Sequence, residues 1–168
     1  SYLGDVIEKT LFDTIYHEHL AYHAVTPLQW FLRRHDLEII DVHRVDSHGG
    51  SIRVISQHVG GPHLKQPSVD AIIDEEKVIG LTSMAAFSRL AAQIDKVKAD
   101  LSKVLSEIKS ASKSIAAFGA PAKATTLMYH FGLDASTIEF IVDDSPLKQG
   151  LYSPGLHVPV ISADEMYQ

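Results

Sequence analysis

The chain has 168 residues, of which 45% are hydrophobic and 21% are charged, and these values are close to the average for a soluble globular protein. Its formal net charge of −6 argues against a nucleic-acid-binding protein, and no apolar run approaches the roughly 18 residues of a membrane span. The absence of cysteine excludes disulfides and thiolate metal sites, and a reducing cytoplasm is the default expectation.

A short helix is predicted first, over about residues 26–35. Thr26 is a typical N-cap residue, and Pro27 would occupy the first helical position. Three apolar residues then follow at helical spacing, Leu28, Phe31 and Leu32.

An antiparallel hairpin and a linker are predicted next. Residues 37–45 (LEIIDVHRV) and 51–59 (SIRVISQHV) alternate apolar and polar side chains around the sequence DSHGG, as the two strands of a hairpin do. Residues 60–70 contain two glycines and two prolines and have no periodic pattern, which is typical of a linker.

A long helical pattern follows, over about residues 71–113. Its apolar residues recur at intervals of three or four: Phe87, Leu90, Ile94, Val97, Leu101, Leu105 and Ile108. Such a stripe predicts a helix that packs one face and leaves the charged face in solvent.

The last third of the chain changes to a strand and helix pattern. Three short apolar segments, SIAAFGA, IEFIVDD and HVPVIS, are candidate buried strands, and the sequence SADEM favours a further helix start. Between the first two strands, PAKATTLMYHFGL predicts a helix that ends at Gly132. This order indicates a parallel α/β unit.

The sequence TIYHEHLAYH, residues 14–23, concentrates side chains that carry chemistry: Tyr16, His17, Glu18, His19, Tyr22 and His23. Three interpretations are open. A zinc site would pair His19 with His23 on one helical face, but His17, Glu18 and His19 cannot then face the same ion. An acid/base site needs one imidazole, one carboxylate and one phenol, which Tyr16, Glu18 and His19 supply. A surface helix that happens to carry histidines needs no function.

The sequence SHGGS is explained by a tight turn, because Gly49 and Gly50 tolerate positive φ angles. An exposed Gly-Gly tip between His48 and Ser51 would also let a ligand approach the backbone closely. Spacing alone favours the turn.

Two further stretches have both a structural and a functional interpretation. In FGAPAKATT a helix start beside Lys123 would suit an anion, although the sequence is neither a G-x-G-x-x-G turn nor a P-loop. In VDDSPLKQG, Asp143 or Asp144 would suit ribose hydroxyls, and helix capping or a loop turn explains the same residues equally well.

Taken together, FDTIYHEHLAY, HGGSIRV, FGAPAKATTLM and DDSPLKQGLYSPGLHVPV occur in an order and spacing that resemble the sugar C-methyltransferase family. Members of that family methylate a nucleotide-linked ketosugar with S-adenosylmethionine. The resemblance spans essentially the whole chain. It implies an α/β protein in which residues 1–58 are the end of a class I methyltransferase core with its antiparallel hairpin. Residues 59–70 would be the linker, and 71–168 a long helix and a truncated Rossmann-like C-terminal domain.

The resemblance also implies roles for the first motif. The second histidine of the family's Tyr-His-Glu-His motif is proposed as a base, and it corresponds here to His19, with Tyr16 and Glu18 as its companions. His19 would take a proton from the carbon alpha to the keto group, Tyr16 would hydrogen-bond the oxyanion, and Glu18 would orient the imidazole. No metal is needed for this step.

The implied cofactor is S-adenosylmethionine, and because this sequence has no glycine-rich methyltransferase loop we expect a segment outside it to bind the cofactor. The implied substrate is a thymidine diphosphate 4-keto-6-deoxy sugar. Its expected contacts are His48, Gly49, Gly50, Ser51, Ala120 and Lys123. A non-catalytic module that binds a nucleotide or packs on a partner domain is the alternative. A nicotinamide-dependent enzyme that uses FGAPAKA as its dinucleotide turn is a third possibility.

Overall fold

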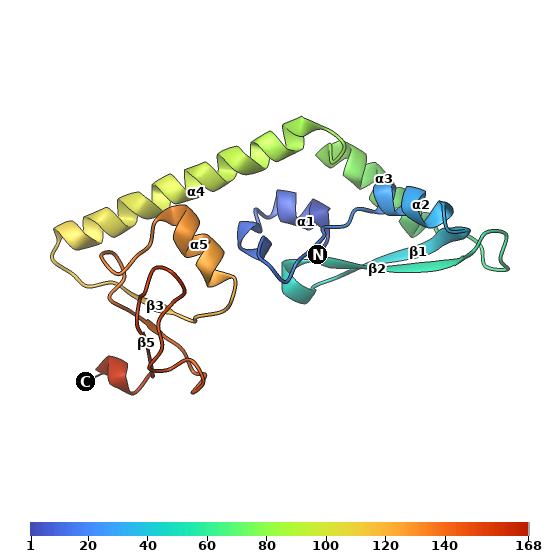
Figure 1. Ribbon diagram of the computed structural model, residues 1–168. Helices are drawn as coiled ribbons and strands as arrows, with labels where there is room; N and C mark the ends of the chain where they lie inside the picture. The colour runs from blue at the N-terminus through green and yellow to red at the C-terminus, as the bar shows by residue number, and fades with distance from the viewer. Residues whose placement is uncertain (168) are drawn as a thin grey trace. The chain divides into compact units, whose positions relative to one another are not determined.

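The computed structural model describes residues 1–167 and has a mixed α/β architecture (Figure 1). It contains an antiparallel hairpin, a long helix and a parallel three-stranded sheet, which confirms the predicted fold class. The chain divides into two compact units. The first consists of Ser1–Phe12 and His17–Ile94, and the second of Asp13–Tyr16 and the residues from Asp95 onward.

The hairpin of the first unit has the predicted boundaries. Strand β1 (Leu37–Val45) pairs antiparallel with β2 (Ser51–His58), with Val42 opposite Val54 and a register shift between Ile39 and Asp41. A short 3₁₀ turn, Ser47–Gly49, connects the two strands.

Helix α2 (Val25–Arg33) confirms the predicted short helix, but the predicted cap is wrong. The N-cap residue is Ala24, which provides no side-chain cap. The backbone N–H groups of Val25 and Thr26 instead donate to the carboxylate of Glu76, at 2.5 and 2.8 Å. Glu76 is only 2% exposed, so a buried side chain from a distant helix replaces the local cap.

The long helical pattern is divided into two helices. Helix α3 (Pro67–Ile79) ends where Gly80 adopts a left-handed conformation, and α4 (Met84–Ser110) begins after the turn. Because α3 begins at Pro67, the last four residues of the expected linker are helical. Helix α3 packs on α2 and β1, so the compact units divide within α4 and not at residues 59–70.

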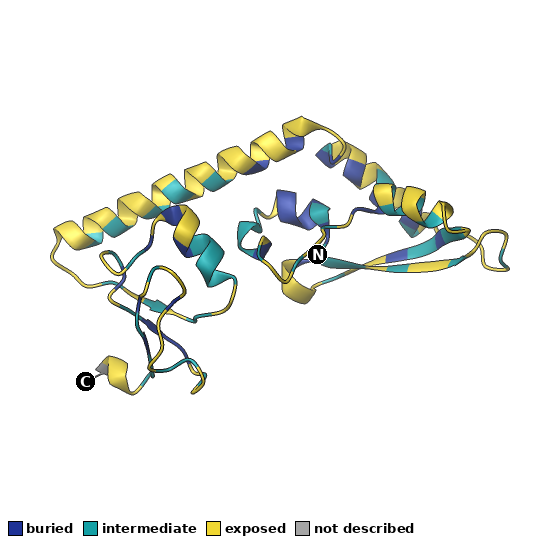
Figure 2. Cartoon of the chain, viewed as in Figure 1, coloured by how far each residue is buried: buried dark blue, intermediate teal, exposed yellow. Residues whose placement is uncertain are grey.

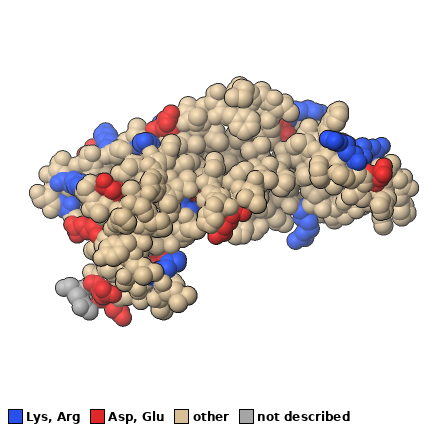
Figure 3. Space-filling model, viewed as in Figure 1, with Lys and Arg blue, Asp and Glu red and all other residues tan. Residues whose placement is uncertain are grey.

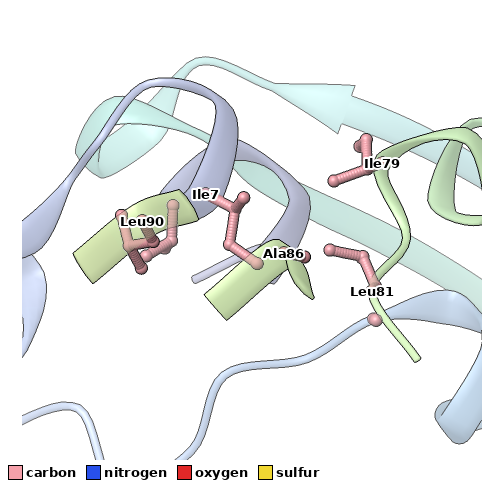
Figure 4. Close-up of a cluster of buried hydrophobic side chains, with 7 residues drawn as sticks. Ile7, Ile79, Leu81, Ala86 and Leu90 are labelled. Atoms are coloured by element: carbon pink, nitrogen blue, oxygen red, sulfur yellow. The ribbon is translucent and has the colours of Figure 1, made fainter. Parts of the chain in front are cut away.

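Two buried clusters form the core of the first unit. One joins α1 (Leu3–Glu8), the α3–α4 turn and the start of α4, and Figure 4 shows five of its members: Ile7, Ile79, Leu81, Ala86 and Leu90. The other lies between the hairpin, α2 and α3, and its buried members are Tyr2, Val25, Ile39, Val42, Val69 and Ile72. Farther along α4 the predicted stripe is less covered, since Val97 is about half exposed and Leu101, Leu105 and Ile108 are only partly buried (Figure 2).

The second unit confirms the predicted parallel arrangement. Strands β3 (Ala116–Phe118), β4 (Phe140–Val142) and β5 (Val160–Ile161) lie parallel in the order β3-β4-β5. Helix α5 (Ala124–Phe131) follows β3 and ends at a left-handed Gly132, as predicted. Its buried Met128 and Phe131 belong to the hydrophobic interior of this unit, together with Leu133, Ile138, Ile141, Val142, Val158 and Val160.

Charged side chains of both signs lie on the face shown in Figure 3. Exposed ion pairs such as Lys77–Asp74 on α3 and Lys96–Asp100 on α4 join charges of opposite sign. Among the described residues, none of the helices combines the length and the apolar character that crossing a membrane requires.

Candidate active site

The histidine-rich segment is not helical. Tyr16 lies in a bend, His17 and Glu18 in a turn, and the chain then runs without regular structure to His23. His23 forms a backbone bridge to the N-terminal segment, where its N–H donates to Ser1 O and its carbonyl accepts from Leu3 N–H. Both the surface-helix interpretation and the helical pairing of His19 with His23 are therefore wrong. Residues 1–167 also contain no group of three or more His, Asp or Glu that could hold a metal ion.

His19 lies beside the tip of the hairpin. Its ring centroid is 6.4 Å from that of His48 and 6.1 Å from that of Tyr22, with edge-on geometry in both pairs. The Ser1 hydroxyl is 3.4 Å from His19 Nδ1. The first unit thus brings together His19 of the Tyr-His-Glu-His motif and His48 of the His-Gly-Gly-Ser motif, which are far apart in the sequence.

The two companions expected for His19 are placed differently. The Glu18 carboxylate is 4.0 Å from His17 Nε2, and both side chains are exposed. Tyr16 is half-buried, donates its N–H to Thr14 O, and belongs with residues 13–16 to the second unit. The orientation of His19 by Glu18 and the oxyanion contact of Tyr16 remain predictions.

The glycines of the hairpin tip are packed against their own chain. At Gly50, which has φ +150°, an added Cβ would lie 2.3 Å from the Asp5 carboxylate, and at Gly49 it would lie 3.0 Å from Leu11. Lys9 donates to the Gly49 carbonyl at 3.0 Å. Helix α1 and the segment after it therefore cover the glycine backbone that the sequence suggested for a ligand.

His48 is the member of this turn whose side chain faces His19. It is exposed and has φ +53°, a left-handed conformation that costs a non-glycine residue roughly 1–3 kcal/mol. Ser51 closes the turn, because its hydroxyl donates to Ser47 O at 3.2 Å. The turn therefore holds His48 in a fixed, strained position next to His19.

A carboxylate network supports this arrangement. Asp5 is buried and accepts from Lys9 at 2.9 Å and from Arg44 at 3.1 Å. The Arg44 guanidinium also lies 5.0 Å from the centroid of the buried Tyr2 ring. Desolvation by burial, with Glu76 nearby, raises the pKa of Tyr2 above its ordinary value. The sequence reasoning missed these residues: Asp5 and Lys9 have the i,i+4 spacing of a helical ion pair, but no spacing rule links Arg44 or Glu76 to them.

In the second unit, the residues expected to contact the substrate already bind other residues of the chain. Lys123, at the start of α5, forms an ion pair with Asp13 at 2.5 Å. Ala120 donates its N–H to Asp143 at 2.7 Å. Both residues line cavities: Ala120 one of about 200 Å³ that includes Lys148 and Tyr152, and Lys123 one of about 260 Å³ that includes Asp13. The sequence analysis missed Asp13, although it lies within the quoted segment FDTIYHEHLAY.

The Asp143 carboxylate has three hydrogen-bond donors around it. It follows β4, is 7% exposed, and accepts from Ala120 N–H, from Ser145 N–H at 2.9 Å and from Lys148 Nζ at 3.0 Å. These bonds lower the pKa of Asp143 to about 2, and the bond from Ala120 N–H contributes most. Of the two structural explanations of this aspartate, helix capping and a loop turn, the loop turn is the one observed.

A family model described as the C-methyltransferase C-terminal domain matches residues 46–168. The chain is also 32% identical over 164 residues to the C-methyltransferase NovU of Streptomyces niveus, an alignment that covers 98% of this chain and 39% of NovU. The chain belongs to the C-methyltransferase family. Because it spans about two fifths of the length of NovU, it corresponds to one part of such a protein.

Membership of the C-methyltransferase family implies S-adenosylmethionine as the methyl donor. In Rossmann-like sites a carboxylate after a strand receives the ribose hydroxyls, beside a glycine-rich turn. In the second unit of this C-methyltransferase the turn after β3 has only Gly119, and the carboxylate of Asp143 already holds three donors. Gly119 and Asp143 therefore do not fit the cofactor.

Proposed function

We propose that the chain is the C-terminal part of an S-adenosylmethionine-dependent C-methyltransferase. Its substrate is a nucleotide-linked 4-keto-deoxysugar, with thymidine diphosphate as the nucleotide and the carbon alpha to the ketone as the methylated position. The observation that carries the proposal is the approach of His19 to His48, at 6.4 Å between ring centroids. Histidine is the side chain most often used as a general base, and the strained turn places His48 beside His19.

The step assigned to this chain is proton transfer. His19 takes the proton from the carbon alpha to the ketone, and the electron pair of the broken C–H bond moves onto the carbonyl oxygen as an enolate. Tyr16 donates a hydrogen bond to the oxyanion, and Glu18 orients the imidazole. A carbon acid of this kind loses its proton readily only when the developing negative charge is stabilised.

The remaining proposed residues hold the substrate. His48 and Ser51 present side chains at the hairpin tip, whereas Gly49 and Gly50 act through the shape of the turn, because Leu11 and Asp5 occupy the space beside them. Ala120 and Lys123 lie on cavities of the second unit and are proposed for the nucleotide part. The lack of cysteine supports a location in the cytoplasm.

Deuterium exchange tests the proposal without the methyl donor. The chain is incubated with thymidine diphosphate 4-keto-6-deoxyglucose in deuterated water, and NMR follows deuterium at C3. His19→Ala should slow the exchange by roughly 100- to 10,000-fold, which is the usual contribution of a positioned base. His17→Ala is the matched control, since His17 is an exposed histidine of the same motif, and it should keep the parent rate.

The thermal unfolding midpoint of each variant shows whether it is folded at the assay temperature. An equal loss in both histidine variants would contradict the assignment of His19. Exchange no faster than that without protein would contradict the ketosugar proposal for this chain.

The cavity of about 200 Å³ in the second unit favours a second candidate, a non-catalytic nucleotide-binding module. It lies beside the carboxyl ends of parallel strands, where ligands of open α/β sheets usually bind. Saturable binding of thymidine diphosphate that survives His19→Ala, with no exchange in either protein, would favour this candidate over the methyltransferase.

A further inference from the structure

The sequence DDSPLKQ, residues 143–149, wraps around the Asp143 carboxylate. The Oδ1 atom accepts from Ser145 N–H, and Oδ2 accepts from both Ala120 N–H and Lys148 Nζ. Gln149 Nε2 donates to the Asp143 carbonyl at 2.9 Å. One buried side chain thus joins the turn after β3 to the loop after β4.

The position of Asp143 decides what the turn after β3 can bind. A backbone N–H at the start of a helix ordinarily suits a phosphate oxygen. Here the Ala120 N–H donates to the carboxylate of Asp143, and the Lys123 ammonium donates to the carboxylate of Asp13. The two groups expected to receive an anion are therefore occupied by internal anions.

Ala120 and Lys148 both line the cavity of about 200 Å³, whose other walls include Thr125, Met128 and Tyr152. Asp143 itself does not line it. Because Asp143 is only 7% exposed and does not line the cavity, a direct contact with a ligand there would require moving the groups bonded to it. Asp143 can therefore act on a ligand only through the residues that it holds.

We propose that Asp143 is a positioning residue, which holds the Lys148 ammonium beside Ala120 at the rim of this cavity so that the nucleotide part of the substrate meets the ammonium in a fixed geometry. The inference rests on the nucleotide-linked substrate of the proposed function. Asparagine cannot replace Asp143, because its NH₂ group would face one of three donors.

The test is a titration of the chain with thymidine diphosphate, followed by ¹H–¹⁵N NMR. Asp143→Asn should move the Ala120 amide proton upfield, because its bond loses the charged acceptor, and should weaken binding about tenfold, the size of one lost hydrogen bond to a charged group. Asp164→Asn is the matched control: Asp164 is an exposed aspartate of the same unit with no assigned role, and its loss should leave both readouts unchanged.

A double-mutant cycle with Lys148→Met separates positioning from general loosening. Lys148→Met alone should weaken binding to a similar extent, and because its side chain is 41% exposed the fold should persist. The double variant should bind no more weakly than the weaker single variant, since Asp143 acts through Lys148. Effects that multiply, to about 100-fold, would overturn the proposal.

Two other results would also overturn it: unchanged binding by Asp143→Asn, or no binding of thymidine diphosphate to the parent chain. If thymidine diphosphate binds and the double-mutant cycle gives the expected result, but deuterium exchange does not depend on His19, only the proposed reaction is contradicted. The two failures are therefore distinguishable.

Discussion

Gly50 of the His-Gly-Gly-Ser motif shows how packing can require a particular amino acid at one position. Its φ of +150° lies in the region that favours glycine, and the Asp5 carboxylate fills the space where a side chain would begin. Asp5 cannot easily move away, because Lys9 and Arg44 both bind it. The glycine is required so that α1 can pack on the turn that carries His48.

Gly50→Ala should therefore destabilise the chain by about 3 kcal/mol, the sum of a left-handed backbone penalty and a steric overlap. Chemical denaturation measures the free energy of unfolding. Gly60→Ala is the control: Gly60 has φ +79° but nothing within 4 Å of an added Cβ, so only the backbone penalty of about 1 kcal/mol should appear. Equal effects would contradict the role of Asp5.

His19 is a second example at the residue scale: its motif can be recognised in the sequence, but the contacts that its side chain makes cannot be predicted from it. The sequence predicted a base with Glu18 and Tyr16 as companions, and the structure adds His48, Tyr22 and Ser1 as its neighbours. Ring contacts of this kind depend on where the chain folds back, which spacing within one motif does not encode.

At the scale of elements, the start of α2 depends on α3. Both Glu76 oxygens are used, Oε1 by Val25 N–H and Oε2 by the N–H and the hydroxyl of Thr26, at 2.8 and 2.6 Å. The segment from the histidine motif leads directly into this helix. Glu76 therefore anchors one end of the segment that carries His19.

Glu76→Gln should cost about 2 kcal/mol of unfolding free energy, because the amide NH₂ would face an N–H donor in a buried site. Amide hydrogen exchange should also accelerate in the first turn of α2. Asp74→Asn is the control: it lies on the same helix in an exposed ion pair with Lys77, and its effect should stay within about 0.5 kcal/mol. A Glu76→Gln variant as stable as that control would contradict the cap.

At the scale of the whole molecule, hydrogen-bonded carboxylates connect stability to pH. Hydrogen bonds lower the pKa of Glu38 and of Asp41. The largest contribution is the bond from Gln57 for Glu38 and the bond from Ser68 for Asp41. In the second unit the pKa of Asp143 falls to about 2. A carboxyl group whose pKa is lower in the folded than in the unfolded chain stabilises the fold above its unfolded pKa of roughly 4.

The unfolding temperature should therefore fall as the pH decreases from 5 toward 2, when these groups take up protons. Asp143→Asn should make this dependence shallower, because the variant has already lost a carboxylate whose pKa is about 2. Thermal unfolding followed by circular dichroism at several pH values measures the slope. Asp144→Asn should keep the slope of the parent, and an unchanged slope in Asp143→Asn would contradict the assignment.

Much of the element order was predictable from the chain itself. Alternation predicted β1 and β2, short apolar runs predicted β3, β4 and β5, and Gly132 predicted the end of α5. These are local signals, since periodicity and a left-handed glycine act within one or two turns of the backbone. The long helix was divided for a local reason as well, because Gly80 adopts a left-handed conformation.

The sequence by itself therefore determined the α/β class, the hairpin, the parallel unit and the motifs that place the chain in the C-methyltransferase family. Only the tertiary structure decided that Glu76 caps α2, that Asp5 shapes the Gly50 turn, that His19 lies beside His48, and that Asp143 holds Ala120 and Lys148. The reason is physical: each of these contacts joins separate segments, and a buried charge or a close backbone approach is set by packing in three dimensions.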